Sequence, residues 1–185
     1  MNHSNLWAPW RMAYLNDLVR KETSLRGDGV AGAGGPPPGS FLEEYWLHPG
    51  DDVLNHVVYR NRNGFLLLNR YPYANGHLLV ALGDSRPRLL DYEPGQRAAF
   101  WRLVDMATNL MEQALNPQGI NMGINQGEAA GAGVPGHFHA HLVPRWHGDT
   151  NFMAVVGAIR VIPDSLDQMA ETYRRIVSER QLSTD

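Results

Sequence analysis

Three histidines stand at alternate positions of the sequence, His137, His139 and His141, with Phe138 and Ala140 between them. Successive side chains of an extended strand point to opposite faces, so the three imidazoles would share one face and the apolar residues the other. Charged imidazoles side by side would repel one another, which favours neutral rings. We therefore predict a strand whose apolar face enters the core and whose histidine face lines a cleft.

Two chemistries use such a row of imidazoles, and the residues alone leave both open. Histidine binds zinc and other transition metals, but the outer two alpha carbons of the strand would lie about 13 Å apart. Zn–N bonds are only about 2.0–2.1 Å long, so a metal would be held by a His-x-His pair with ligands from elsewhere, such as His77. Neutral imidazole is also a good nucleophile near neutral pH, and a flanking histidine can donate a hydrogen bond to a phosphate oxygen.

A glycine-rich stretch, 127–136, leads directly into these histidines. Glycine lets the backbone approach a ligand closely, and exposed backbone N–H groups can hold phosphate oxygens. The position of this loop favours chemistry at phosphorus.

The elements that position the histidines follow from hydrophobic periodicity. Strand patterns cover residues 56–60, 64–69, 77–82, 120–124 and 137–143, and helical spacing covers 94–115 and about 165–177. A turn at 71–76 joins two apolar runs over seven residues, which predicts adjacent antiparallel strands. We expect Asp164 to cap the last helix and Pro144 to end the histidine strand. The pattern predicts an α+β domain with an antiparallel sheet.

Composition excludes several classes of protein. The chain has 185 residues, a net charge of -3 and no cysteine. Disulfides, cysteine-bound zinc, iron–sulfur clusters and a thiol nucleophile are therefore excluded. The acidic balance argues against a nucleic-acid partner, and no apolar run is long enough for a membrane helix. With no secretory signal at the start of the sequence, we expect a cytoplasmic protein.

The N-terminal part of the sequence has a different character. Residues 1–26 predict an arm, in which Trp7 and Trp10 pack on the body of the protein or on a partner subunit. Residues 27–39 contain nine glycines and prolines, which predicts a linker or long loop. The catalytic domain is expected to span 40–185.

Two blocks of the sequence resemble the histidine triad (HIT) superfamily. The stretch 136–143, Gly-His-Phe-His-Ala-His-Leu-Val, is similar to the family signature, and 68–80 resembles its Asn…Pro…Gly-His block. The string 127–153 and the Trp-Ala-Pro-Trp-Arg arm at 7–11 resemble the branch of diadenosine tetraphosphate phosphorylases and related hydrolases. The resemblance implies a five-stranded antiparallel sheet with two main helices, here with an added N-terminal arm, and a homodimer.

The resemblance also implies an activity on dinucleoside polyphosphates, either phosphorolysis or hydrolysis. His139 would attack the α-phosphorus and form a nucleotidyl-histidine intermediate, with its far nitrogen held by a backbone carbonyl. His137 and His141 would hydrogen-bond phosphate oxygens, and His77 would support the triad. The implied substrate-binding residues are Asn69 for the ribose, Gln126 for an oxygen at the α-phosphate, and Gly131, Gly133 and Val134 for the phosphates.

The sequence departs from the family in two respects. Many relatives carry Cys-x-x-Cys and a further histidine as a zinc site, but 39–42 holds no cysteine and 84–88 no histidine. We therefore expect no bound metal and no required cofactor, with Mg²⁺ only as a companion of the polyphosphate substrate. Val134 stands near a position where some relatives use a hydroxyl to help the leaving group. A metal-dependent hydrolase with a His-x-His site and a non-catalytic nucleotide-binding protein are the alternatives.

Overall fold

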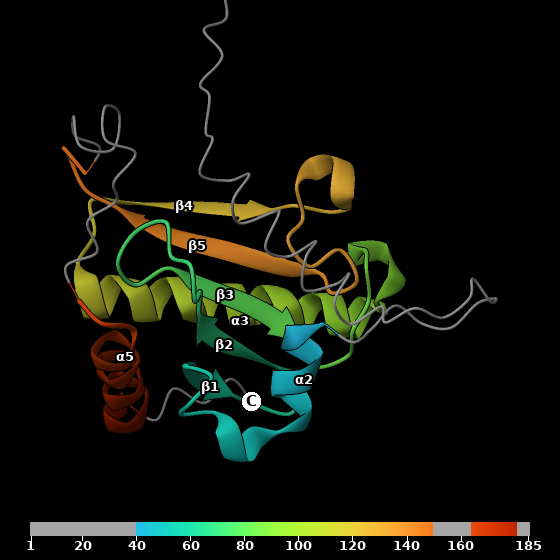
Figure 1. The fold of residues 1–185 in the computed structure, drawn as a ribbon, viewed down its shortest axis with the longest axis horizontal. Helices are drawn as coiled ribbons and strands as arrows, with labels where there is room; N and C mark the ends of the chain where they lie inside the picture. Colours follow the sequence, from blue (N-terminus) through green and yellow to red (C-terminus); the bar gives the residue numbers. More distant parts are fainter. Residues whose placement is uncertain (1–39, 150–163, 181–185) are drawn as a thin grey trace, which may run out of the picture. The chain divides into compact units, whose positions relative to one another are not determined.

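Five strands form one antiparallel sheet in the part of the chain that the structure describes, residues 40–149 and 164–180 of this computed structural model (Figure 1). They are β1 (Val57–Arg60), β2 (Gly64–Leu68), β3 (Leu78–Leu82), β4 (Gly119–Ile124) and β5 (His139–Arg145), in the order β1-β2-β3-β5-β4. The predicted α+β class is confirmed. The strand with the histidines lies inside the sheet, between β3 and β4. The predicted arm, 1–26, and linker, 27–39, lie outside the described residues.

Two longer helices and one short helix accompany the sheet among these residues: α2 (Phe41–Leu47), α3 (Pro94–Leu115) and α5 (Leu166–Arg180). The predicted helix 94–115 is confirmed at both ends, with Pro94 in its first turn and Glu93 and Gln96 forming a capping box. None of the described helices is both long and apolar enough to span a membrane. Three short 3₁₀ turns complete the described chain: η1 (Pro49–Asp51), η2 (Leu89–Asp91) and η3 (Glu128–Ala130).

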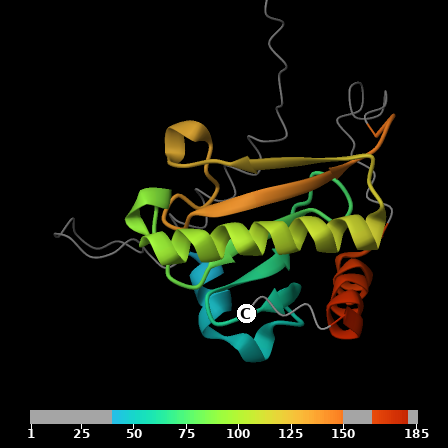
Figure 2. The same cartoon turned by 180° about the vertical axis from the view of Figure 1, so that it is seen from behind.

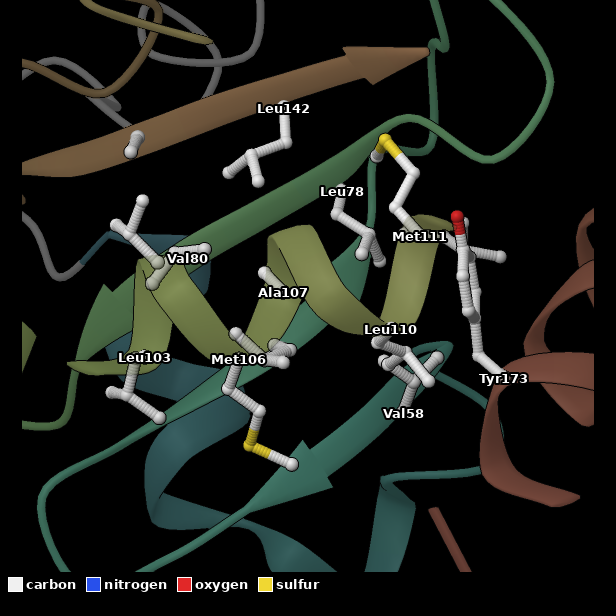
Figure 3. Packing of buried hydrophobic residues seen from close by; sticks show 14 of the residues in the cluster. Val58, Leu78, Val80, Leu103, Met106, Ala107, Leu110, Met111, Leu142 and Tyr173 are labelled. Carbon is white, nitrogen blue, oxygen red and sulfur yellow. The ribbon is translucent and has the colours of Figure 1, made fainter. Parts of the chain in front are cut away.

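The two faces of the sheet carry different elements. Figure 2 shows α3 running across one face, with α5 beside its end. Apolar side chains of β3, β5, α3 and α5 fill this main core (Figure 3), among them Leu78, Val80, Leu142, Leu103, Ala107, Leu110 and Tyr173. On the other face, Leu42 of α2 packs with Phe65, Leu67, Leu79 and Ala81.

The strand register assigns the histidines to the face opposite α3. His139 pairs with Ala81 and His141 with Leu79, both of which belong to the smaller cluster beside α2. Ala140 lies in the main core instead. The predicted alternation of faces along β5 is therefore confirmed for these positions.

Several predicted boundaries were wrong by one or two residues. The strand predicted at 56–60 begins at Val57 because His56 has a positive φ of 53°. The strands predicted from residues 77 and 137 begin at 78 and 139, because the N–H groups of His77 and His137 close turns on the carbonyls of Ala74 and Val134. The strand predicted from residue 120 begins one residue earlier, at 119.

The prediction that Pro144 ends the histidine strand was also wrong. Pro144 lies within β5 and pairs with Ile120 of β4. The Arg145 carbonyl bonds Gln118 on the β4 side, so the nitrogen of Pro144 faces the β3 side. β3 pairs only as far as Leu142, so no ladder hydrogen bond is lost there.

Asp164 is not the N-cap of the last helix. α5 begins at Leu166, and the Oγ of Ser165 accepts the Gln168 backbone N–H at 3.2 Å. Asp164 instead accepts the N–H of Ser165. A serine at this position caps as well as an aspartate does.

Gly76 precedes His77 in a position that tolerates no side chain. Its φ is +79°, and an added Cβ would lie 2.3 Å from Leu115 Cδ1 and 2.8 Å from the Tyr173 hydroxyl. We expect Gly76→Ala to lower the free energy of unfolding by about 2–4 kcal/mol, from backbone strain and overpacking together. Urea denaturation followed by circular dichroism measures this.

Gly95→Ala is the matched control, because Gly95 lies in the first turn of α3 with open space around a built Cβ. It should leave stability unchanged or raise it by up to about 1 kcal/mol. Equal stability of the two variants would contradict the packing described for Gly76.

Candidate active site

His139 lies at the start of β5 and is held in one tautomer by the backbone. Its Nδ1 lies 2.8 Å from the carbonyl oxygen of His137. A carbonyl can only accept, so Nδ1 carries the proton and Nε2 of the neutral ring keeps its lone pair. Within the described residues, Nε2 has no hydrogen-bond partner. A neutral ring with an unused lone pair can act as a nucleophile.

Burial keeps this ring neutral. Only 3% of His139 is exposed, and desolvation lowers its pKa. The hydrogen bond to the His137 carbonyl raises the pKa, but by less than burial lowers it. His139 is therefore unprotonated at neutral pH.

A second pair of histidines forms a relay of hydrogen bonds beside His139. The backbone N–H of Tyr73 donates to His77 Nδ1 at 3.1 Å, so the proton of His77 is on Nε2. That nitrogen lies 3.0 Å from His141 Nδ1 and donates to it. The proton of His141 is consequently on Nε2, and its ring centroid lies 4.9 Å from that of His139. An N–H donor therefore lies beside the His139 ring.

His137 is fully buried and bonded at both ring nitrogens. Its Nε2 donates to the Leu82 carbonyl at 2.7 Å, and its Nδ1 lies 2.9 Å from Ser40 Oγ. Burial lowers the pKa of His137 to about 4. The predicted hydrogen bond from His137 to a phosphate oxygen stays a prediction, and forming it would require Nε2 to leave Leu82.

The predicted ribose-binding residue Asn69 lies next to the histidines. Asn69 Nδ2 lies 3.3 Å from His77 Nδ1, and its Oδ1 accepts the Tyr71 N–H at 3.0 Å. Gln126 Oε1 accepts the Leu89 N–H at 3.0 Å. Its predicted contact with the α-phosphate stays a prediction.

The glycine-rich loop before β5 is partly anchored by the fold. Gly131 has a positive φ of 80°, and its carbonyl accepts Asn125 Nδ2 at 3.4 Å. Val134 packs against the smaller cluster, and its carbonyl accepts the His137 N–H. Gly133 is half-buried in the same loop. Contacts of this loop with phosphates stay predictions.

Sequence reasoning missed three groups that hold the histidines: the Ser40 hydroxyl, the Tyr73 backbone N–H and the Leu82 carbonyl. The pattern Ser-x-x-Glu at 40–43 signals the start of a helix, and Ser40 does cap α2 by accepting the Glu43 N–H. That pattern predicts nothing about His137. The Tyr73 ring also stacks on His141, with centroids 6.0 Å apart and planes 10° from parallel.

Three ring nitrogens of the triad are already occupied and are not available as metal ligands. His139 Nδ1 and both nitrogens of His137 are bonded to oxygen atoms of the protein. Across residues 40–149 and 164–180, no three His, Cys, Asp or Glu side chains are placed to share one ion. No step of the chemistry below is therefore routed through a metal.

Comparisons with known proteins agree with this geometry. The HIT domain family model matches residues 52–148. The AP-4-A phosphorylase of Mycobacterium tuberculosis H37Rv is 33% identical over 174 residues, 94% of this chain and 83% of the relative. An asymmetrical bis(5'-nucleosyl)-tetraphosphatase of Schizosaccharomyces pombe is 32% identical over 97 residues. The matched residues make up 52% of this chain and 53% of the relative.

Solved structures of histidine triad proteins are also similar to this chain. A Zn-bound histidine triad family protein from Mycobacterium smegmatis is 26% identical with a TM-score of 0.61, covering 77% of this chain and 98% of that one. The chain belongs to the HIT family, as the resemblance of residues 136–143 and 68–80 predicted.

The buried state of His137 makes stability depend on pH. Its pKa is about 4 in the folded protein and 6.5 ordinarily. Between these values the unfolded chain binds a proton and the folded protein does not, so acidification favours unfolding. We expect the free energy of unfolding to fall by about 2–3 kcal/mol from about pH 7 to about pH 4.5.

Urea denaturation at the two pH values measures the loss, and His137→Gln, which cannot titrate, should lose less. A His137 ring that titrates near its ordinary pKa in an NMR experiment would contradict the prediction.

Proposed function

We propose that this chain cleaves dinucleoside polyphosphates, such as diadenosine tetraphosphate, through a covalent nucleotidyl intermediate on His139. One observation carries the proposal: the His139 ring is neutral, with its proton held on Nδ1 and its Nε2 lone pair unused by the described residues. The relatives are named as phosphorylases and phosphatases of such nucleotides, in agreement with the expectation of an enzyme. A metal-dependent hydrolase finds no support in the donor set.

The first step makes a P–N bond and breaks a P–O bond. His139 Nε2 attacks an α-phosphorus, and the remaining nucleoside polyphosphate leaves with the bridging oxygen, as ATP when the substrate is diadenosine tetraphosphate. The Nε2–H of His141 donates to a phosphate oxygen, where negative charge builds up in the transition state. The imidazole becomes part of a phosphoramidate that keeps its Nδ1–H on the His137 carbonyl.

In the second step, His139 is the leaving group instead of the nucleophile. An oxygen of water or of inorganic phosphate attacks the same phosphorus, the P–N bond breaks, and the electron pair returns to Nε2. Water gives AMP and phosphate gives ADP, with the proton of the attacking group passing to solvent. The relative that matches 94% of this chain is a phosphorylase, whereas the tetraphosphatase matches 52%, so inorganic phosphate is the acceptor we favour.

Two features of assembly and location stay predictions. The predicted homodimer would continue the sheet across an edge strand, and β4 is such an edge, with Met122 57% exposed. The cytoplasmic location rests on sequence alone.

Replacing the nucleophile tests the mechanism. We expect His139→Asn to lower kcat on diadenosine tetraphosphate by at least about 10⁴-fold, while the Kd for a non-hydrolysable analogue changes little. Steady-state kinetics and calorimetry measure the two quantities.

His147→Asn is the matched control, because His147 is exposed and makes no contact with the triad in the described structure. It should keep normal turnover. Substantial activity in the His139 variant would contradict a nucleotidyl-histidine.

Product analysis identifies the acceptor. With inorganic phosphate, we expect ADP and ATP from diadenosine tetraphosphate, because phosphate oxygen attacks the intermediate. Without phosphate, turnover should fall sharply. Chromatography separates the products, and AMP with ATP at an undiminished rate without phosphate would identify a hydrolase instead.

A further inference from the structure

Ser40 reaches the triad from a helix that lies far away in the sequence. Its hydroxyl oxygen lies 2.9 Å from His137 Nδ1, a contact between residues 97 positions apart. Ser40 is also the N-cap of α2, where its Oγ accepts the Glu43 N–H at 3.0 Å. The start of α2 and the first histidine of the triad therefore share one hydroxyl group.

The direction of each hydrogen bond follows from groups that cannot reverse. The Leu82 carbonyl only accepts, so His137 carries its proton on Nε2. A neutral ring then presents a lone pair at Nδ1, and the Ser40 hydroxyl must donate to it. The same oxygen is free to accept from the Glu43 amide, so both bonds are satisfied at once.

His137 in turn sets the tautomer of His139 through its backbone. The His137 carbonyl is the acceptor for His139 Nδ1 at 2.8 Å, and the buried His137 ring anchors that residue to Leu82 and Ser40. Loss of the Ser40 hydroxyl leaves the buried Nδ1 unsatisfied while the Leu82 carbonyl still requires the proton on Nε2, which drives the ring toward another position. Movement of the ring displaces the carbonyl that aims His139.

We propose that Ser40 is a positioning residue of the active site: its hydroxyl holds the His137 ring in place and thereby fixes the carbonyl that makes His139 Nε2 the nucleophile. The inference rests on the proposed function for its catalytic consequence. Its structural part, the position of the His137 ring and the tautomer of His139, stands independently of any substrate.

Three substitutions separate the hydroxyl donor from the helix cap. Ser40→Thr keeps both the donor and the cap. Ser40→Asp keeps a good cap, but an ionised carboxylate cannot donate to His137 Nδ1. Ser40→Gly lacks the hydroxyl, although glycine at an N-cap weakens a helix only slightly. The corresponding changes at Ser165, the N-cap of α5, are matched controls.

Two readouts follow in the full-length protein. In ¹⁵N-histidine NMR spectra of Ser40→Asp and Ser40→Gly, we expect the His137 Nδ1 resonance to move, because this nitrogen loses its hydrogen-bond donor, and His139 to lose its pure Nδ1–H tautomer. With diadenosine tetraphosphate, kcat should fall about 10-fold in both variants while KM stays within about two-fold, because Ser40 affects the aim of the nucleophile and not substrate binding. Ser40→Thr and the Ser165 variants should match the wild type.

An unchanged His139 tautomer in Ser40→Asp and Ser40→Gly would overturn the inference, and so would an equal loss of kcat in the Ser165 variants. Ser40→Asp keeps the test valid if the glycine variant fails to fold. A wild-type protein without activity on dinucleoside polyphosphates would refute the proposed function alone, since the NMR spectra would still decide the role of Ser40.

Discussion

The hydrogen bond from His139 Nδ1 to the His137 carbonyl is the interaction on which the site depends. At 2.8 Å it is an ordinary bond, and bonds of this kind contribute only about 0.5–1.5 kcal/mol to stability. The bond matters because it selects the tautomer of His139: it decides which nitrogen of the buried, neutral ring carries the proton and which keeps a lone pair. It forms because the chain turns at His137, whose N–H bonds the Val134 carbonyl, and becomes a strand only at His139.

The same rule applies to the other histidines, because a backbone group defines each tautomer. The Tyr73 N–H sets His77 and, through it, His141, while the Leu82 carbonyl sets His137. Backbone amides and carbonyls do not titrate, so the pattern of protons is built into the fold. Burial reinforces it by lowering the pKa of His137 and His139. The sheet supplies this burial by placing β5 between β3 and β4.

The sequence was most informative where the pattern is local and repeated. Helix α3 was predicted correctly because its apolar residues recur at helical spacing between Pro94 and Pro117, and the histidines could be assigned to one face from their alternation. Boundaries set by single turn hydrogen bonds, such as those of His77 and His137, were missed. The prediction for Pro144 was wrong because a proline can continue a strand at a point where the neighbouring strand no longer pairs with it, and the sequence does not show where β3 stops pairing. The contact of Ser40 with His137 spans 97 positions and leaves no local signal.

The proposed mechanism depends on a covalent bond between His139 and the innermost phosphorus of the nucleotide. Mass spectrometry of the protein, quenched in alkali during turnover because phosphoramidates are acid-labile, tests it most directly. We predict a mass increase of one nucleotidyl group, located by peptide mapping on His139. Steady product formation by protein that carries no adduct, or an adduct on another residue, would contradict the claim.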